Sequence, residues 1–210
     1  VILLGSLDPA FVEMVKNTKT PRIFVDYYDE TRSHDCVLME NFYNMYDATC
    51  HLLECGHREI GFVGSLMVTQ SINDRFLGYQ RALLQWKIPV REEWLIPDRT
   101  PDNEPIEMQL PEKLPQAFVC NCDETAYRLM RQLARRGIRV PEDLSIVSFD
   151  DDVFATMTQP PLSTVAVHVD DMAQKAADCM MENMKPGYRS RGEIHLVRGE
   201  MVFRESVKNR

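Results

Sequence analysis

Short apolar runs alternate with longer amphipathic stretches along most of this 210-residue chain. The runs with the clearest strand character cover residues 22–27, 58–65, 116–121 and 144–150. Stretches of helical periodicity separate them, among them residues 44–56, 70–86, 123–137 and 170–184. Asp123 fits the cap of the helix 123–137. Residues 193–197 and 200–206 are expected to form a final hairpin. Since parallel strands need a crossover connection that is usually a helix, this order predicts an α/β fold, with parallel sheets covered by helices on both faces.

Polar side chains follow several of the predicted strands, at the edge where sheets of this kind bind ligands. Asp26, Ser65 and Asp150 stand at the ends of apolar runs. Asp150 opens a run of three aspartates, and a carboxylate there can accept hydrogen bonds from vicinal hydroxyls or ligate a cation. The alternative is a solvated turn or a helix cap, which is the role we assign to Asp151 and Asp152.

Arg75 lies in the first half of the predicted helix 70–86. Its guanidinium offers a planar fork of donors to a sugar, a carboxylate or a phosphate. The alternative is a surface ion pair with Asp74 or Glu54. Ser71 can donate to the same ligand or cap the helix.

The composition fits a globular protein, with 44% hydrophobic and 27% charged residues. The formal net charge of −8 argues against direct DNA binding by these 210 residues, because such surfaces are usually basic. No apolar stretch approaches the roughly 18–20 residues that span a bilayer. We expect the six cysteines to be reduced thiols in a cytoplasmic protein. We also expect this chain to be part of a longer protein, because it opens on a strand-like run without an initiating Met.

Enzyme and metal motifs are not evident in the sequence. There is no Gly-rich phosphate loop and no G-x-S-x-G elbow, and His57 has no obvious nucleophile as a partner. A metal site built from Cys50, His51, Cys55 and His57 is disfavoured because these positions do not share one helix face. We therefore expect no catalytic residues, no metal and no cofactor. The alternative, a hydrolase that uses Asp150 and a metal, is less favoured.

Five motifs occur in a familiar order. They are "GHREIGFVGS" (56–65), "RFLGY" (75–79), "VPEDLSIVSFDD" (140–151), "PPLSTV" (160–165) and "RGEMVFRESV" (198–207). Together they resemble the effector-binding core of the LacI/GalR (lactose-repressor-type) transcription regulators, over essentially the whole chain.

The resemblance implies two doubly wound parallel-sheet lobes joined by crossover hinge strands, as in type I periplasmic binding proteins. The N-terminal lobe would comprise residues 1–58 and 166–188, and the C-terminal lobe residues 59–165 and 189–210. It implies a sugar-like effector in the cleft between the lobes, and a homodimer. It also implies contact with DNA through a head domain that is absent from this chain.

The same resemblance assigns roles to individual residues. Arg75 matches the arginine that clamps the effector, and Asp150 the aspartate that binds effector hydroxyls or amines. Ser71 and Asp26 match positions that often contact the effector, Asp26 from the N-terminal lobe. Cys122 stands where the family usually has an asparagine.

Two further departures from the family pattern follow. Val167 stands at a glutamine position, and Arg99 or Thr100 stands near the place of an aromatic side chain. Asn121 is not a safe substitute for the missing asparagine, because a one-residue shift on a strand reverses the side chain. The effector therefore cannot be copied from a relative.

We interpret the chain as the effector-binding and dimerisation domain of a bacterial, cytoplasmic, ligand-responsive transcription regulator. A transport-type periplasmic sugar-binding protein is the main alternative, because it shares the fold. A family member that responds to a partner protein in place of a small molecule is another, and the Cys122 departure keeps it open.

Overall fold

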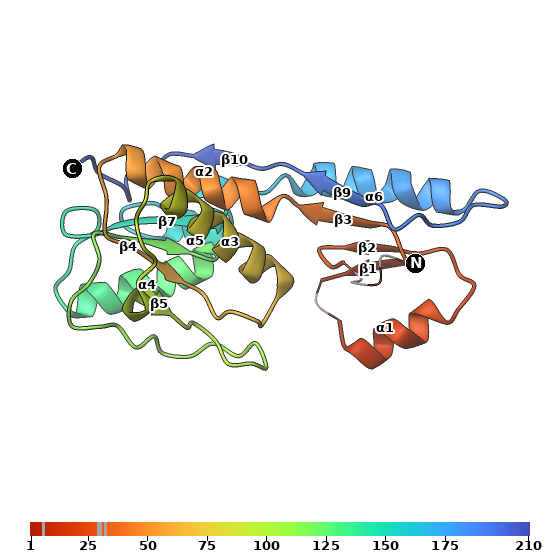
Figure 1. The fold of residues 1–210 in the computed structure, drawn as a ribbon, viewed down its shortest axis with the longest axis horizontal. Helices are drawn as coiled ribbons and strands as arrows, with labels where there is room; N and C mark the ends of the chain where they lie inside the picture. The colour runs from red at the N-terminus through yellow and green to blue at the C-terminus, as the bar shows by residue number, and fades with distance from the viewer. Residues whose placement is uncertain (6, 29–30, 32) are drawn as a thin grey trace. The chain divides into compact units, whose positions relative to one another are not determined.

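The computed structural model describes residues 1–5, 7–28, 31 and 33–210. It divides the chain into two compact units (Figure 1). Unit 1 comprises residues 1–40 and 168–198, and unit 2 comprises residues 41–167 and 199–210. Both units have the predicted α/β architecture.

Unit 1 contains a four-stranded sheet in which all strands are parallel. Its order is β1 (Ile2–Leu4), β2 (Ile23–Val25), β3 (Cys36–Met39) and β9 (Ile194–Val197). Helix α6 (Val169–Asn183) packs against β2 and β3. Helix α1 (Pro9–Lys16) buries Val12 in a small core with side chains of the strands.

Unit 2 contains a six-stranded sheet of order β10-β8-β7-β6-β4-β5. The strands are β4 (Ile60–Val63), β5 (Leu95–Ile96), β6 (Ala117–Cys120), β7 (Ser145–Asp150), β8 (Ser163–Ala166) and β10 (Glu200–Val202). All pairs are parallel except β10 with β8, which is antiparallel. The carboxyl ends of β4, β5, β6 and β7 therefore meet at one edge.

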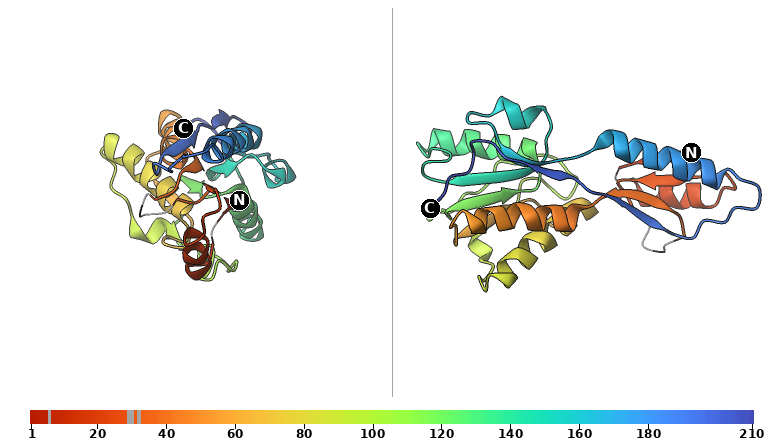
Figure 2. Two further views of the ribbon diagram at one scale, coloured as in Figure 1. Left: turned by 90° about the vertical axis from the view of Figure 1, so that its right-hand side faces the viewer. Right: turned by 90° about the horizontal axis from the view of Figure 1, so that it is seen from above.

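Helices cover both faces of this sheet (Figure 2). The helical elements are α2 (Asn41–Glu54), α3 (Gln70–Gln85), the short 3₁₀ helix η1 (Glu92–Trp94), α4 (Asp123–Arg135) and α5 (Val153–Met157). Helix α2 packs on β6, β7 and β8 and lies against α3, while α4 packs on β6 and β7.

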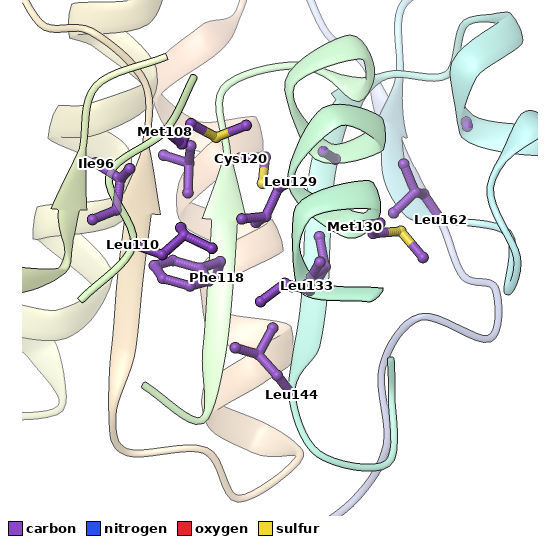
Figure 3. Close-up of a cluster of buried hydrophobic side chains, with 14 residues drawn as sticks. Ile96, Met108, Leu110, Phe118, Cys120, Leu129, Met130, Leu133, Leu144 and Leu162 are labelled. Atoms are coloured by element: carbon purple, nitrogen blue, oxygen red, sulfur yellow. The ribbon is translucent and has the colours of Figure 1, made fainter. Parts of the chain in front are cut away.

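The period-two pattern of the strands divides the core between these faces. Phe118 and Cys120 alternate along β6 and point toward α4, where they meet Leu129 and Leu133 (Figure 3). In α4 the buried apolar residues follow a helical repeat, because positions three and four apart share a face. This packing fixes α4 against the strands whose ends carry the polar residues.

Two expectations are corrected by the structure. Residues 193–197 and 200–206 do not form a final hairpin, since β9 pairs with β3 in unit 1 and β10 pairs with β8 in unit 2. The boundaries of the units also differ from those expected, because α2 packs on α3 and β7 of unit 2. The chain thus passes to unit 2 at residue 41 and not near residue 58.

The described residues contain no helix with the length and apolar content that a bilayer crossing requires. All six cysteines are free of disulfide bonds.

Gly78 allows α3 to approach α2 closely. A Cβ at this position would overlap the carbonyl oxygen of Phe42 and come within 3.0 Å of the Tyr46 amide nitrogen. Both atoms belong to the backbone of α2, so neither can move aside cheaply. The glycine therefore sets the spacing of the two helices.

We expect the Gly78→Ala variant to be less stable than the wild type. Overpacking costs typically about 1–3 kcal/mol, which exceeds the gain in helix propensity of at most about 1 kcal/mol. Urea unfolding followed by circular dichroism measures the difference. The Arg81→Ala variant, on the exposed side of the same helix, should change stability by less than about 0.5 kcal/mol. A Gly78→Ala variant as stable as the wild type would contradict this account of the helix spacing.

Candidate functional site

The buried guanidinium of Arg75 connects three separate segments of unit 2. Arg75 Nε donates to Asn41 Oδ1 at 2.8 Å, and Nη1 donates to the carbonyl oxygen of Asn121 at 2.6 Å. Nη2 lies 3.3 Å from Asp150 Oδ1. The guanidinium also stacks on Phe149, with its central carbon 3.8 Å from the ring centroid. Arg75 is only 8% exposed, so these contacts replace water for a buried charge.

Three consecutive aspartates stand at the end of β7, beginning with its last residue, and each has a different role. Asp150 pairs with Arg75 and keeps a third of its side chain exposed. Asp151 pairs with Arg204 at 2.6 Å, and Asp152 caps α5 by accepting from the Phe154 amide at 2.8 Å. Asp150 and Asp151 have φ angles of 114° and 54°, which non-glycine residues seldom adopt. Positive φ values of this kind are concentrated at functional sites.

A second charged centre surrounds Asp98, which is fully buried. Its carboxylate accepts hydrogen bonds from Arg99 Nη2 at 2.7 Å, Thr125 Oγ1 at 2.6 Å, Asn121 Nδ2 at 2.9 Å and the Ser65 amide at 2.8 Å. Burial raises the pKa of Asp98, but these hydrogen bonds, led by the one from Arg99, outweigh it and lower the pKa to about 2. Asp98 is therefore ionised at neutral pH, and its carboxylate holds the ends of β4, β5 and β6 together.

Ser65 and Ser71 have structural partners. The Ser65 hydroxyl donates to the Arg99 carbonyl at 2.7 Å and accepts from the amides of Asp98 and Arg99 at 3.0 and 2.9 Å. Ser71 Oγ lies 3.0 Å from the hydroxyl of Thr69, which caps α3. Ser65 thus holds the loop after β5, and Thr69, not Ser71, is the helix cap.

Cys122 lies beside the two charged centres, at the N-cap position of α4. Its Sγ is 3.3 Å from Thr125 Oγ1 and 3.8 Å from Arg99 Nη2. Burial, and then the nearby Asp150, raise the pKa of this thiol. The Asn121 amide next to it points to Asp98, so it does not replace the asparagine that the resemblance led us to expect at position 122.

Asp123 does not cap α4, because Cys122 occupies that position. Its buried carboxylate accepts from the hydroxyls of Ser148 and Thr164, the latter at 2.7 Å, and from the Asp152 amide at 3.0 Å. Burial raises the pKa of Asp123 to about 6 despite these hydrogen bonds. The group thus ties β7 and β8 to the start of α4.

Asp26 belongs to unit 1, where it follows β2 with a φ of 55° and an exposed side chain. Its amide donates to the Val37 carbonyl at 2.9 Å. Its participation in the same ligand site as Arg75 stays a prediction.

The structure therefore brings Arg75 and Asp150 together, with Cys122 and Ser65 on the same edge of the sheet. Sequence reasoning missed Asn41, Asp98 and Phe149. For Asp98 a signal was present, since "WLIPD" (94–98) is a short apolar run ending in an aspartate, inside a stretch that lacked periodicity. No comparable signal marked Asn41.

The charged side chains at this edge of the sheet already hold one another in position, so they can form hydrogen bonds with a ligand without moving. Asp150 presents a partly exposed acceptor that Arg75 orients, and Arg99 presents donors that Asp98 orients. Among the residues that the structure describes, no cluster of histidine, cysteine and carboxylate side chains could hold a metal ion.

Comparisons with known proteins agree with this architecture. Residues 49–207 match the family described as periplasmic binding protein-like domain. The PurR repressor of Actinobacillus pleuropneumoniae, an HTH-type transcriptional repressor, is 30% identical over 206 residues, which cover 94% of this chain and 60% of that protein. The arabinose metabolism transcriptional repressor of Geobacillus stearothermophilus is 31% identical over 213 residues, covering 97% and 58%.

A solved structure is similar along nearly the whole chain. The Escherichia coli transcriptional repressor ascG superimposes with a TM-score of 0.75 at 28% identity, covering 94% of this chain and 73% of that one. The present chain spans about three fifths of the length of the two curated repressors.

The buried Asp123 predicts a pH dependence of stability. Since its folded pKa of about 6 exceeds the ordinary value of 3.8, the unfolded state loses its proton first as the pH rises. The contribution of Asp123 to the free energy of unfolding therefore falls between pH 4 and pH 6 and is level above pH 7. A shift of this size corresponds to about 3 kcal/mol.

Urea unfolding of the wild type and of the Asp123→Asn variant between pH 4 and pH 8 measures this contribution. The stability of the variant relative to the wild type should rise by up to about 3 kcal/mol across that range. The Asp102→Asn variant, in an exposed turn, serves as the control for the loss of one carboxylate. A flat difference for Asp123→Asn would show that this carboxyl titrates normally.

Proposed function

Because the chain belongs to the family of periplasmic binding protein-like domains, as an effector-binding core of the LacI type, we propose that it binds a small, hydroxyl-rich molecule at Arg75 and Asp150. The observation that carries this proposal is the geometry of that pair. Arg75 is fixed by Asn41 and Asn121 before any ligand arrives, and it orients a carboxylate that is still partly exposed. Preorganised partners of this kind reduce the ordering cost of binding.

The chemistry of the site favours a sugar or a sugar derivative as the effector. A carboxylate accepts hydrogen bonds from vicinal hydroxyls, and a guanidinium donates to ring and hydroxyl oxygens. One relative is named for arabinose metabolism, which supports this class. Cys122 and Arg99 give the site its own donors, so the effector cannot be copied from any particular relative.

For the whole protein we propose a transcription regulator of the bacterial cytoplasm. DNA contact is made by a segment outside these 210 residues, in agreement with the net charge of −8. The protein acts as a homodimer, and the effector shifts its DNA affinity through different affinities for two conformations. Asp26 contributes to effector binding from unit 1.

The main alternative is a transport-type periplasmic sugar-binding protein, which shares the fold. The similarity to repressors over more than 90% of the chain favours the regulator. An enzyme is disfavoured because, among the described residues around Arg75, the hydrogen-bond partners of Cys122 and Ser65 include no histidine that could act as a base.

A thermal-shift panel of sugars, sugar phosphates and nucleosides tests the proposal. We expect one class to raise the melting temperature of the wild-type chain. The Asp150→Asn variant keeps the size of the side chain but loses the charge, so it should bind that ligand about ten- to a hundredfold more weakly, as for a charge-assisted hydrogen bond of about 1.5–3 kcal/mol. Calorimetry gives the two dissociation constants.

The matched control is Asp151→Asn, which removes the same charge one residue along, where the carboxylate pairs with Arg204. This variant should bind like the wild type. Equal binding by wild type and Asp150→Asn would refute the site assignment. A folded wild-type chain that responds to no compound of the panel would favour regulation by a partner protein.

A further inference from the structure

A hollow of about 310 Å³ lies on the outer side of α4, away from the side that packs on the sheet. Arg128, Arg131 and Arg135 line it, three and four residues apart on one helix face. The segment 105–108 forms its other wall. This hollow is separate from the side chains that contact Arg75.

The hollow is positively charged in a chain that is acidic as a whole. Glu107 is the one carboxylate among its lining residues, and it accepts a hydrogen bond from Gln132 Nε2 at 3.3 Å. In the described part of the chain, none of the three arginines lies in an ion pair with a carboxylate. The local charge of three arginines and one glutamate is therefore +2, against −8 for the whole chain.

The contacts of these three arginines occupy only some of their N–H donors. Arg128 donates to the carbonyl oxygens of Asp98, at 3.2 Å, and Ile106, so its guanidinium is held in place while its charge is not neutralised. Arg131 lies 5.7 Å from the ring centroid of Tyr127, and Arg135 is exposed at the last turn of the helix. A fixed guanidinium beside two adaptable ones suits a ligand with several anionic oxygens.

An unused acceptor adds a second requirement on the ligand. Gln132 lines the hollow, and in the described structure its Nε2 donates to Glu107 Oε1 and to the Met108 carbonyl, each at 3.3 Å. Its Oε1 is buried and has no hydrogen-bond partner in the described structure. A buried acceptor of this kind usually finds a donor. A ligand with an O–H group beside its anionic oxygens meets both requirements.

We infer that the Arg128–Arg131–Arg135 hollow is a binding site for a phosphate group, with hydrogen phosphate as the simplest ligand. Its oxygens accept from the three guanidinium groups, and its hydroxyl donates to Gln132. The inference does not depend on the proposed effector site, because none of the residues that line the hollow contacts the Arg75 guanidinium.

Isothermal titration of the chain with inorganic phosphate, at constant ionic strength adjusted with sodium chloride, tests the inference. The Arg131→Gln/Arg135→Gln double variant replaces two exposed side chains, so it should fold normally and bind phosphate at least tenfold more weakly. The charge-matched control is Arg81→Gln/Arg189→Gln, which removes two exposed arginines elsewhere and should bind like the wild type. Sulfate, which has the same shape but no proton to donate, should bind more weakly than phosphate.

Two further outcomes locate the bound ion. Asp150→Asn should leave phosphate binding unchanged, because Asp150 belongs to the Arg75 site. A change of phosphate affinity in either direction in Asp150→Asn, with none in Arg131→Gln/Arg135→Gln, would place the phosphate at the effector site and overturn the inference. Equal responses of the wild type and both double variants, or no binding to the wild type, would also overturn it.

Discussion

The carboxyl edge of the six-stranded sheet depends on a single buried cation. A guanidinium that is 8% exposed has lost most of its water, and leaving it unpaired would cost several kcal/mol. Arg75 avoids that cost only if Asn41, Asn121 and Asp150 are all in position. These residues come from the start of α2, the end of β6 and the end of β7, so the charge of one side chain specifies how three remote segments meet.

Asp98 does the same for the neighbouring half of the edge, with the opposite charge. Its carboxylate fixes Arg99, Asn121 and Thr125, and Asn121 links the two centres because its carbonyl accepts from Arg75 and its amide donates to Asp98. Each cation at this edge thus has its own anion. The result is a surface rich in oriented donors and acceptors whose charges are balanced within the protein, which suits recognition by hydrogen bonds more than attraction of a charged ligand from a distance.

The sequence predicted the fold class because strand and helix periodicities alternate clearly, and strand ends in a parallel sheet share one edge. It therefore placed Ser65 and Asp150 at one edge, while the role of Arg75 beside Asp150 was implied only by the resemblance to the LacI/GalR regulators. It could not show that β9 and β10 belong to different sheets, since two short runs three residues apart look like a hairpin until their partners are known. Asp98 escaped because β5 has only two residues, too few for a pattern. Asp123 looked like a helix cap because it begins the helical stretch 123–137. Its burial against Ser148 and Thr164 is a tertiary effect that the local sequence does not show.

Gly78 and Arg75 lie one helical turn apart on α3, and this spacing has a meaning for redesign. The glycine lets α3 approach the backbone of α2, and the arginine then reaches Asn41 at the first residue of α2. Helices α2 and α3 therefore form one preassembled part of the structure that carries the Arg75 cation and its acceptor Asn41. Variation at Arg99, Cys122 and the loop after β5 leaves that part untouched. A library of variants intended to change ligand preference should therefore vary the residues at the strand ends and keep α2 and α3 constant.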